Sequence, residues 1–178
     1  MRIRRPTRRG MTLVETALVL SIFLMLLFGI FEYCRFIMVL HVTNNAARDG
    51  ARYATVNANC LDQAAIDAKK AAIIQYTTDR MAGVSNNISN LAIAVYPCDS
   101  AGLTQSPPVL RYKPANPASP VYPDPFNPGG AALNWNAAQF TERIAVTVKG
   151  NYTPVLPTLL FMSTTVPIYV TAVTESEG

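Results

Sequence analysis

A basic leader followed by a long apolar run constrains this chain more than any other feature. Five arginines precede Gly10, at positions 2, 4, 5, 8 and 9, and the apolar run begins at Met11 and continues to Leu40. As a helix, residues 11–40 reach about 45 Å, whereas the hydrocarbon core of a bilayer is about 30 Å thick. The run therefore predicts a single transmembrane helix over residues 11–40. The arginines place residues 1–10 in the cytoplasm, and everything after Leu40 outside the inner membrane.

The position of the small residue distinguishes this segment from a secretory signal. A secretory signal has its cleavage site after a short apolar core, whereas Gly10 lies before the core. A cut after Gly10 would remove the leader and make Met11 the first residue of the mature protein. Glu15 would then be the fifth residue. A carboxylate costs about 2.5–3.5 kcal/mol at the bilayer centre and less near the edge. The amine of a new N-terminal Met11 would lie about 6 Å along the helix from Glu15, and it can offset that cost on the same chain or on a neighbour. The alternative is that Glu15 lies at headgroup level, where water solvates it.

Two further patterns occur along the same helical register. Glu32 and Arg35 are three residues apart, which predicts an ion pair at the outer interface with Arg35 reaching outward. Ala46, Gly50 and Ala54 recur every four residues, so they form a small-residue face that lets another helix approach closely. That helix can belong to another subunit or to the chain's own domain, and the sequence leaves both readings open.

Three motifs occur along the first 54 residues: RGMTLVE at residues 9–15, Phe28-Gly29-Ile30 followed by Glu32, and NAARDGARYA at residues 45–54. Together they resemble the TadE-like family, which comprises pilin-like minor components of the Flp (tight adherence, Tad) pilus. A weaker likeness covers residues 144–175. The resemblance implies a prepilin that a prepilin peptidase cuts after Gly10, with Glu15 in peptidase recognition or assembly. The implied partners are other pilin or pseudopilin subunits and the Tad assembly machinery, besides the lipid bilayer.

The remaining residues, 41–178, predict a small extracytoplasmic domain. A second helix is expected over 61–82, with Asn59 as its N-cap, Gly83 as its stop and an apolar stripe on one face. A strand is expected over 91–96, ended by Pro97. Alternation predicts two more strands near the C-terminus. The expected fold is α+β, a long transmembrane helix continuing into one or two helices packed on an antiparallel sheet of three or four strands. The predicted helix stripe comprises Leu61, Ala65, Ala68, Ala72 and Tyr76, and the predicted inward strand residues are Ile144, Val146, Val148, Val166, Ile168, Val170 and Ala172.

A proline-rich segment, residues 107–128, interrupts the domain. Its proline density excludes a helix or strand of ordinary length. It is either a surface excursion without a partner or an exposed binding loop that carries Tyr112, Tyr122 and Phe126.

The three cysteines differ by location. Cys34 lies in the outer half of the span, where we expect it to pack as a small apolar residue. Cys60 and Cys98 lie in the exported part, where an oxidising compartment permits a disulfide. We expect that bridge, and two separate buried thiols are the alternative.

Nothing in the composition indicates catalysis, a metal, a cofactor or a nucleic-acid partner. His41 is the only histidine, so neither a catalytic triad nor a histidine metal cluster can form. Of the 15 Lys and Arg residues five lie in the leader, which leaves ten basic against 11 acidic residues in the mature chain. The basicity therefore reflects membrane topology and not a polyanion partner. Two functions remain, a minor pilin cut after Gly10 and an uncleaved single-pass periplasmic binding or sensor domain, and the mature N-terminus separates them.

Overall fold

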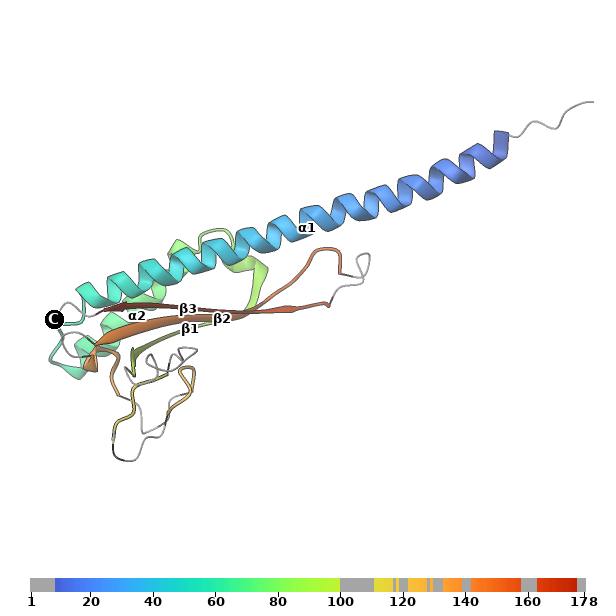
Figure 1. The fold of residues 1–178 in the computed structure, drawn as a ribbon. Coiled ribbons are helices and arrows are strands. Elements are labelled where there is room, and N and C mark those ends of the chain that lie inside the picture. Colours follow the sequence, from blue (N-terminus) through green and yellow to red (C-terminus); the bar gives the residue numbers. More distant parts are fainter. Residues whose placement is uncertain are drawn as a thin grey trace, which may run out of the picture.

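The computed structural model describes residues 9–99, 111–116, 118, 122–127, 129, 133–138, 142–157 and 163–175. Over these residues the chain forms two α-helices and an antiparallel sheet whose strand order is β1-β2-β3 (Figure 1). This arrangement confirms the predicted α+β fold. The elements are α1 (Arg9–Val56), α2 (Gln63–Arg80), β1 (Ile88–Cys98), β2 (Arg143–Tyr152) and β3 (Val166–Glu175), with short 3₁₀ helices η1 (Ser85–Asn87) and η3 (Trp135–Ala137).

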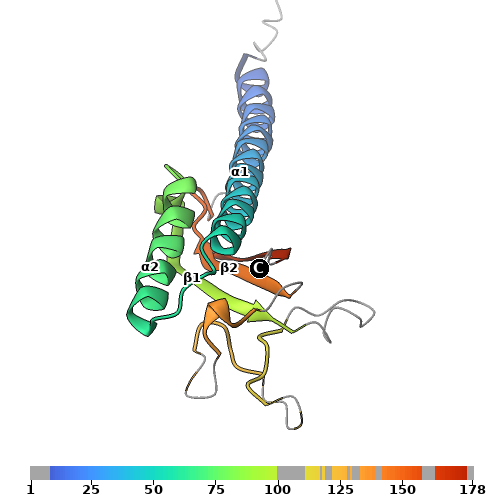
Figure 2. The ribbon, with the colours of Figure 1, turned by 90° about the vertical axis from the view of Figure 1, so that its left-hand side faces the viewer.

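Both helices lie on the same face of the sheet. The C-terminal half of α1 packs over β2 and β3, whereas α2 lies beside it and contacts β1 (Figure 2). Alternate residues of β2 and β3 point toward the helices, because successive side chains of a strand point to opposite faces. The alternation in the sequence therefore predicted both strands correctly. The inward residues are Ile144, Val146, Val148, Ile168, Val170 and Ala172, all of them in the main hydrophobic core.

Part of the proline-rich segment packs on the opposite face of the sheet. Tyr112 is 4% exposed and stacks on Tyr96 of β1, with ring centroids 5.1 Å apart. Its hydroxyl donates a hydrogen bond to the carbonyl oxygen of Leu133 at 2.5 Å. Tyr112 is therefore a core residue and not a binding-loop residue, whereas Tyr122 is exposed.

Strand β1 is longer than predicted and includes Pro97. Proline is tolerated on an edge strand because its missing N–H need not face another strand, and β1 lies at the edge of the sheet. The Pro97 carbonyl accepts a hydrogen bond from the Lys113 backbone N–H at 2.8 Å, so the edge is partly paired.

The predicted apolar stripe of α2 was wrong. Its buried residues are Ile66, Ile73 and Thr77. The predicted alanines are exposed, and so is Leu61, which lies before the helix. The larger isoleucine side chains remove more apolar area from water than alanine does, so the helix rotates to bury them. The N-cap is Asp62 instead of Asn59, and Gly83 has a φ of +80° in the turn that follows the helix.

The predicted disulfide between Cys60 and Cys98 is not formed, because both residues are free thiols. Cys60 lies between α1 and α2 and packs beside the main core. Cys98 ends β1 and lies in the cluster on the other face of the sheet. The sheet therefore separates the two sulfurs. Cys34 is exposed on α1 and does not pack in the core.

Candidate functional site: the junction between the apolar helix and the domain

The N-terminal half of α1 projects from the domain (Figure 1). No described side chain from Thr12 to Phe31 is buried, although most of them are apolar. Twenty helical residues span about 30 Å, which matches the hydrocarbon core of a bilayer. By length and composition, α1 is a candidate membrane anchor.

The residues of the predicted cleavage junction lie at the start of this helix. The backbone of Gly10 and Met11 belongs to the first turn of α1, while their side chains lie outside the described residues. Glu15 is exposed on the projecting helix. The nearby hydroxyl of Thr16 donates to the Thr12 carbonyl at 2.8 Å, so this polar group is satisfied within the helix. The roles predicted for Gly10, Met11 and Glu15 stay predictions.

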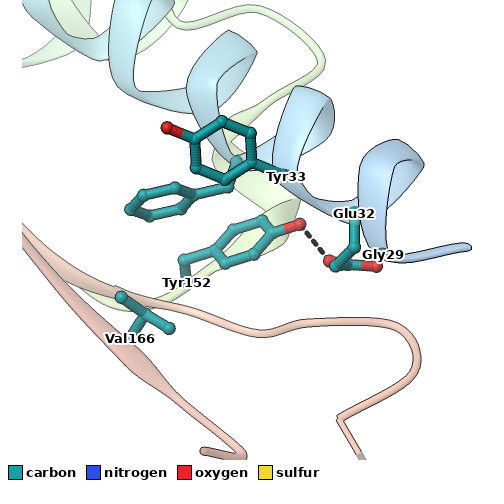
Figure 3. Close-up of a pocket in the computed structure, with 6 residues that line it drawn as sticks. Gly29, Glu32, Tyr33, Tyr152 and Val166 are labelled. Atoms are coloured by element: carbon teal, nitrogen blue, oxygen red, sulfur yellow. Dashed lines mark hydrogen bonds between the residues drawn. The ribbon is translucent and has the colours of Figure 1, made fainter. Parts of the chain in front are cut away.

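Glu32 is the first described residue of α1 to be buried, at 6% exposure. The Tyr152 hydroxyl at the end of β2 donates a hydrogen bond to Glu32 Oε1 (Figure 3). The Val155 backbone N–H donates to Glu32 Oε2 at 3.3 Å. Both carboxylate oxygens are therefore engaged by the segment that leaves β2, which compensates for the cost of burying the charge.

Arg35 also bonds to the domain. Its Nη2 donates to Asn87 Oδ1 at 2.6 Å, and its guanidinium carbon lies 5.8 Å from the centre of the Tyr152 ring. The predicted Glu32–Arg35 ion pair is therefore wrong, because each side chain takes its partners from the domain. An ion pair three residues apart on a helix contributes only about 0.2–0.5 kcal/mol, so the hydrogen bonds of the buried carboxylate outweigh it.

Tyr152 connects the two charged residues. Its ring is fully buried and packs on Phe36 with centroids 5.4 Å apart. Burial, and then the hydrogen bond to Glu32, raise the pKa of Tyr152 to about 12. The phenol therefore stays protonated near neutral pH and acts as a hydrogen-bond donor to the carboxylate.

A cavity of about 330 Å³ lies at this junction (Figure 3). Most of its wall is apolar or aromatic, and Glu32, its one charged side chain, already has partners for both oxygens. The cavity therefore suits an apolar group better than a charged ligand. Its lining residues are Gly29, Glu32, Tyr33, Phe36, Tyr152 and Val166.

The small-residue face of α1 packs on the chain's own domain. Ala46, Gly50 and Ala54 are buried. A Cβ added at Gly50 would lie 2.2 Å from Thr77 Oγ1 on α2, so the two helices approach closely at this point. Of the two readings left open by the sequence, the structure supports packing on the chain's own domain, with α2 against Gly50.

No sequence pattern predicted the hydrogen-bond partners of Tyr152, Val155 or Asn87. A glutamate near the end of an apolar helix needs donors, but the sequence offers no way to find a partner more than a hundred residues away. No group of three or more His, Cys, Asp or Glu residues that could hold a metal is found among the described residues. His41 is exposed on α1.

A protein-family model described as TadE-like protein matches residues 10–52. Comparison with curated proteins and with solved structures finds no match. The matched segment includes the candidate anchor and the junction residues Glu32 and Arg35, and it ends before α2 and the sheet. Over residues 10–52 the resemblance is confirmed, because this segment is similar to the TadE-like family.

Proposed function

We propose that this chain is a minor pilin or pseudopilin of a Flp-type (type IVc, Tad) pilus, and not an enzyme. A prepilin peptidase cuts it after Gly10, and the mature protein takes part in pilus assembly or adhesion. The observation that carries the proposal is the TadE-like match, which begins at Gly10 itself and covers the projecting apolar helix.

The exposed helix supports this proposal. An apolar helix of bilayer length that does not pack on its own domain needs lipid or other helices around it. In the inner membrane it holds the protein as a single-pass anchor, with the leader in the cytoplasm and the domain in the periplasm. In a pilus, or at its base or tip, the same surface packs against neighbouring subunits. Its partners are thus the bilayer, the prepilin peptidase, other subunits and the Tad assembly machinery, with no role for nucleic acid.

The mature N-terminus tests the proposal. Intact-mass measurement of protein purified from membranes should give a dominant species that begins at Met11 when an active prepilin peptidase is present. Cells without the peptidase should give the uncut chain. Gly10→Leu is the matched control, because it keeps the leader and the apolar helix but fills the junction with a large side chain. A dominant uncut species in cells with active peptidase would contradict the proposal.

One observation favours a second candidate, an uncleaved single-pass binding or sensor domain of the periplasm. The cavity of about 330 Å³ beside Glu32 offers room for an apolar ligand. The same mass measurement separates the two functions, since the second one requires the leader to be retained.

A further inference from the structure

Two loops form the end of the domain that lies nearest the projecting half of α1. They are the turn Val84–Asn87 after α2 and the segment Thr153–Pro157 after β2 (Figure 1). The Thr153 backbone N–H donates to the Asn87 carbonyl at 3.3 Å, so the two loops are joined to each other.

Both loops are fixed to α1 at the level where its exposed part ends. Asn87 accepts the hydrogen bond from Arg35, and the Val155 N–H donates to Glu32. The exposed run of α1 ends one residue before Glu32. Any bilayer that surrounds this run therefore ends at the height of these two loops.

The depth of the loops follows from the length of the exposed helix. The residues from Thr12 to Phe31 cover about 30 Å, the thickness of the hydrocarbon core. If Glu15 instead marks the inner boundary, the same thickness ends near Arg35. In the first case the loops lie within the headgroup region, and in the second they lie at the outer edge of the hydrocarbon core.

The two loops also carry no charged residue. The chain has none from 81 to 98 and none from 150 to 174, the two ranges that include the loops. The turn between α1 and α2, at the other end of the domain, is followed by Asp62, Asp67, Lys69 and Lys70. A surface that enters the lipid boundary avoids charge, because a charged group there loses hydration.

Exposed side chains at this end suit a lipid boundary. Val155 is 61% exposed, and Tyr33 on the adjacent turn of α1 is 64% exposed. Tyrosine is enriched at membrane–water interfaces, where its ring and hydroxyl meet different surroundings. Of the other exposed or half-exposed loop residues, Ser85, Asn86, Asn87 and Thr153 are polar and uncharged, as the headgroup region accepts, and Leu156 and Pro157 are apolar.

We propose that this end of the domain, Val84–Asn87 with Thr153–Pro157, rests on the lipid surface, and that the Val155 side chain inserts among the lipids. The proposal rests on α1 acting as the membrane anchor. The contact also explains the junction, because the donors from Tyr152 and Val155 replace water around the Glu32 carboxylate at a depth where water is scarce. The domain then stands in one fixed orientation on the bilayer.

Tryptophan quenching by brominated lipids tests this contact in the full chain. Val155→Trp is made, and the protein is reconstituted into phosphatidylcholine vesicles with or without brominated acyl chains. The substitution leaves the contact with Glu32 in place, since that contact uses the Val155 backbone N–H. The native Trp135 is 2% exposed within the domain, so the parent protein supplies the background.

Two matched variants make the result decisive. Leu18→Trp reports insertion of the anchor, because Leu18 is exposed in the projecting helix. Leu61→Trp reports the opposite end of the domain, where Leu61 is 99% exposed. We expect brominated lipid to quench the added emission of the Leu18 and Val155 variants, and to leave the Leu61 variant at the parent level.

Three results would overturn the proposal. Quenching at Leu18 without quenching at Val155 would mean that the anchor inserts while the domain stands clear of the lipid. Blue-shifted but unquenched emission at Val155, dependent on the protein-to-lipid ratio, would mean that a second copy covers this surface. Absence of quenching in Leu18→Trp would show that α1 is not inserted in the bilayer. The membrane anchor would then be wrong, which is a different failure from loss of the lipid contact at Val155.

Discussion

Tyr152, the last residue of β2, donates its phenolic hydrogen to Glu32, which lies 120 residues earlier on α1. The contact joins the end of the sheet to the helix at the first buried position after the projecting segment. Together with the Arg35–Asn87 hydrogen bond, it fixes the direction in which the apolar helix leaves the domain. The domain and the candidate anchor are thus held as one unit at this point.

Tyr152→Phe should destabilise the domain by about 1–3 kcal/mol, because it leaves a buried Glu32 oxygen without its donor. Chemical unfolding of the full chain in detergent measures the loss. Tyr169→Phe is the matched control, since Tyr169 is 61% exposed. Equal stability of the two variants would show that the hydroxyl of Tyr152 contributes nothing.

The same residue predicts a loss of stability at alkaline pH. Folding raises the pKa of Tyr152 from 10.0 to about 12, so the folded state favours the protonated phenol. The corresponding stabilisation is complete below about pH 10 and is lost as the pH rises through about 12. Tyr96, whose pKa burial also raises to about 12, adds to the loss. Unfolding measured from about pH 9 to 12 should show a shallower decline in Tyr152→Phe than in the parent. Parallel curves for the two proteins would contradict the assignment.

Local sequence patterns predicted the elements of this fold but not the contacts between them. The apolar run predicted α1, and the alternation of residues such as Val146 and Val170 predicted β2 and β3, because each pattern directly reflects one buried face. In α2, small residues occur on several faces of the helix and obscure the buried face. Only the large apolar side chains of Ile66 and Ile73 identify that face.

The junction escaped prediction for a different reason. An ion pair of Glu32 with Arg35 is the local solution, and sequence reasoning finds local solutions first. The actual partners, Tyr152 and Asn87, lie on elements whose placement depends on the whole core. The same limit applies to Cys60 and Cys98. The sheet lies between them, and their spacing in the sequence does not reveal this.

Gly50→Ala should destabilise the packing of α1 on α2. The new Cβ would lie 2.2 Å from Thr77 Oγ1, and that buried hydroxyl already donates to the Ile73 carbonyl at 2.8 Å. Overpacking costs about 1–3 kcal/mol, while replacing a helical glycine by alanine returns up to about 1 kcal/mol. Unfolding free energies of Gly50→Ala, Thr77→Ala and the double variant measure the coupling. The double variant should lose less than the sum of the single losses, and simple additivity would show that the two residues do not clash.

The two domain cysteines should differ in reactivity. Burial raises the pKa of the Cys98 thiol to about 11, which suppresses the thiolate that reacts with alkylating agents. Cys60 is only partly buried. Brief treatment of the native protein with iodoacetamide, followed by peptide mapping, should label Cys60 faster than Cys98. Urea-unfolded protein, in which both thiols are accessible, is the control. A peptide pair linked through Cys60 and Cys98, or equal labelling rates in the native protein, would contradict the structure.

Glu15 provides the last prediction, which concerns the proposed pilus role. If the Glu15 carboxylate neutralises the Met11 amine of a neighbouring subunit, then Glu15→Gln keeps the shape of the helix and its insertion but removes the charge that sets the register. Glu15→Leu should insert even more readily, because it removes the cost of an acid in an apolar span, and should be equally defective in assembly. Pilus formation and co-purification of other subunits are measured together with membrane level and leader cleavage. Normal piliation by both variants would mean that Glu15 is merely solvated at the headgroups. Loss of cleavage in both would instead assign Glu15 to recognition by the peptidase.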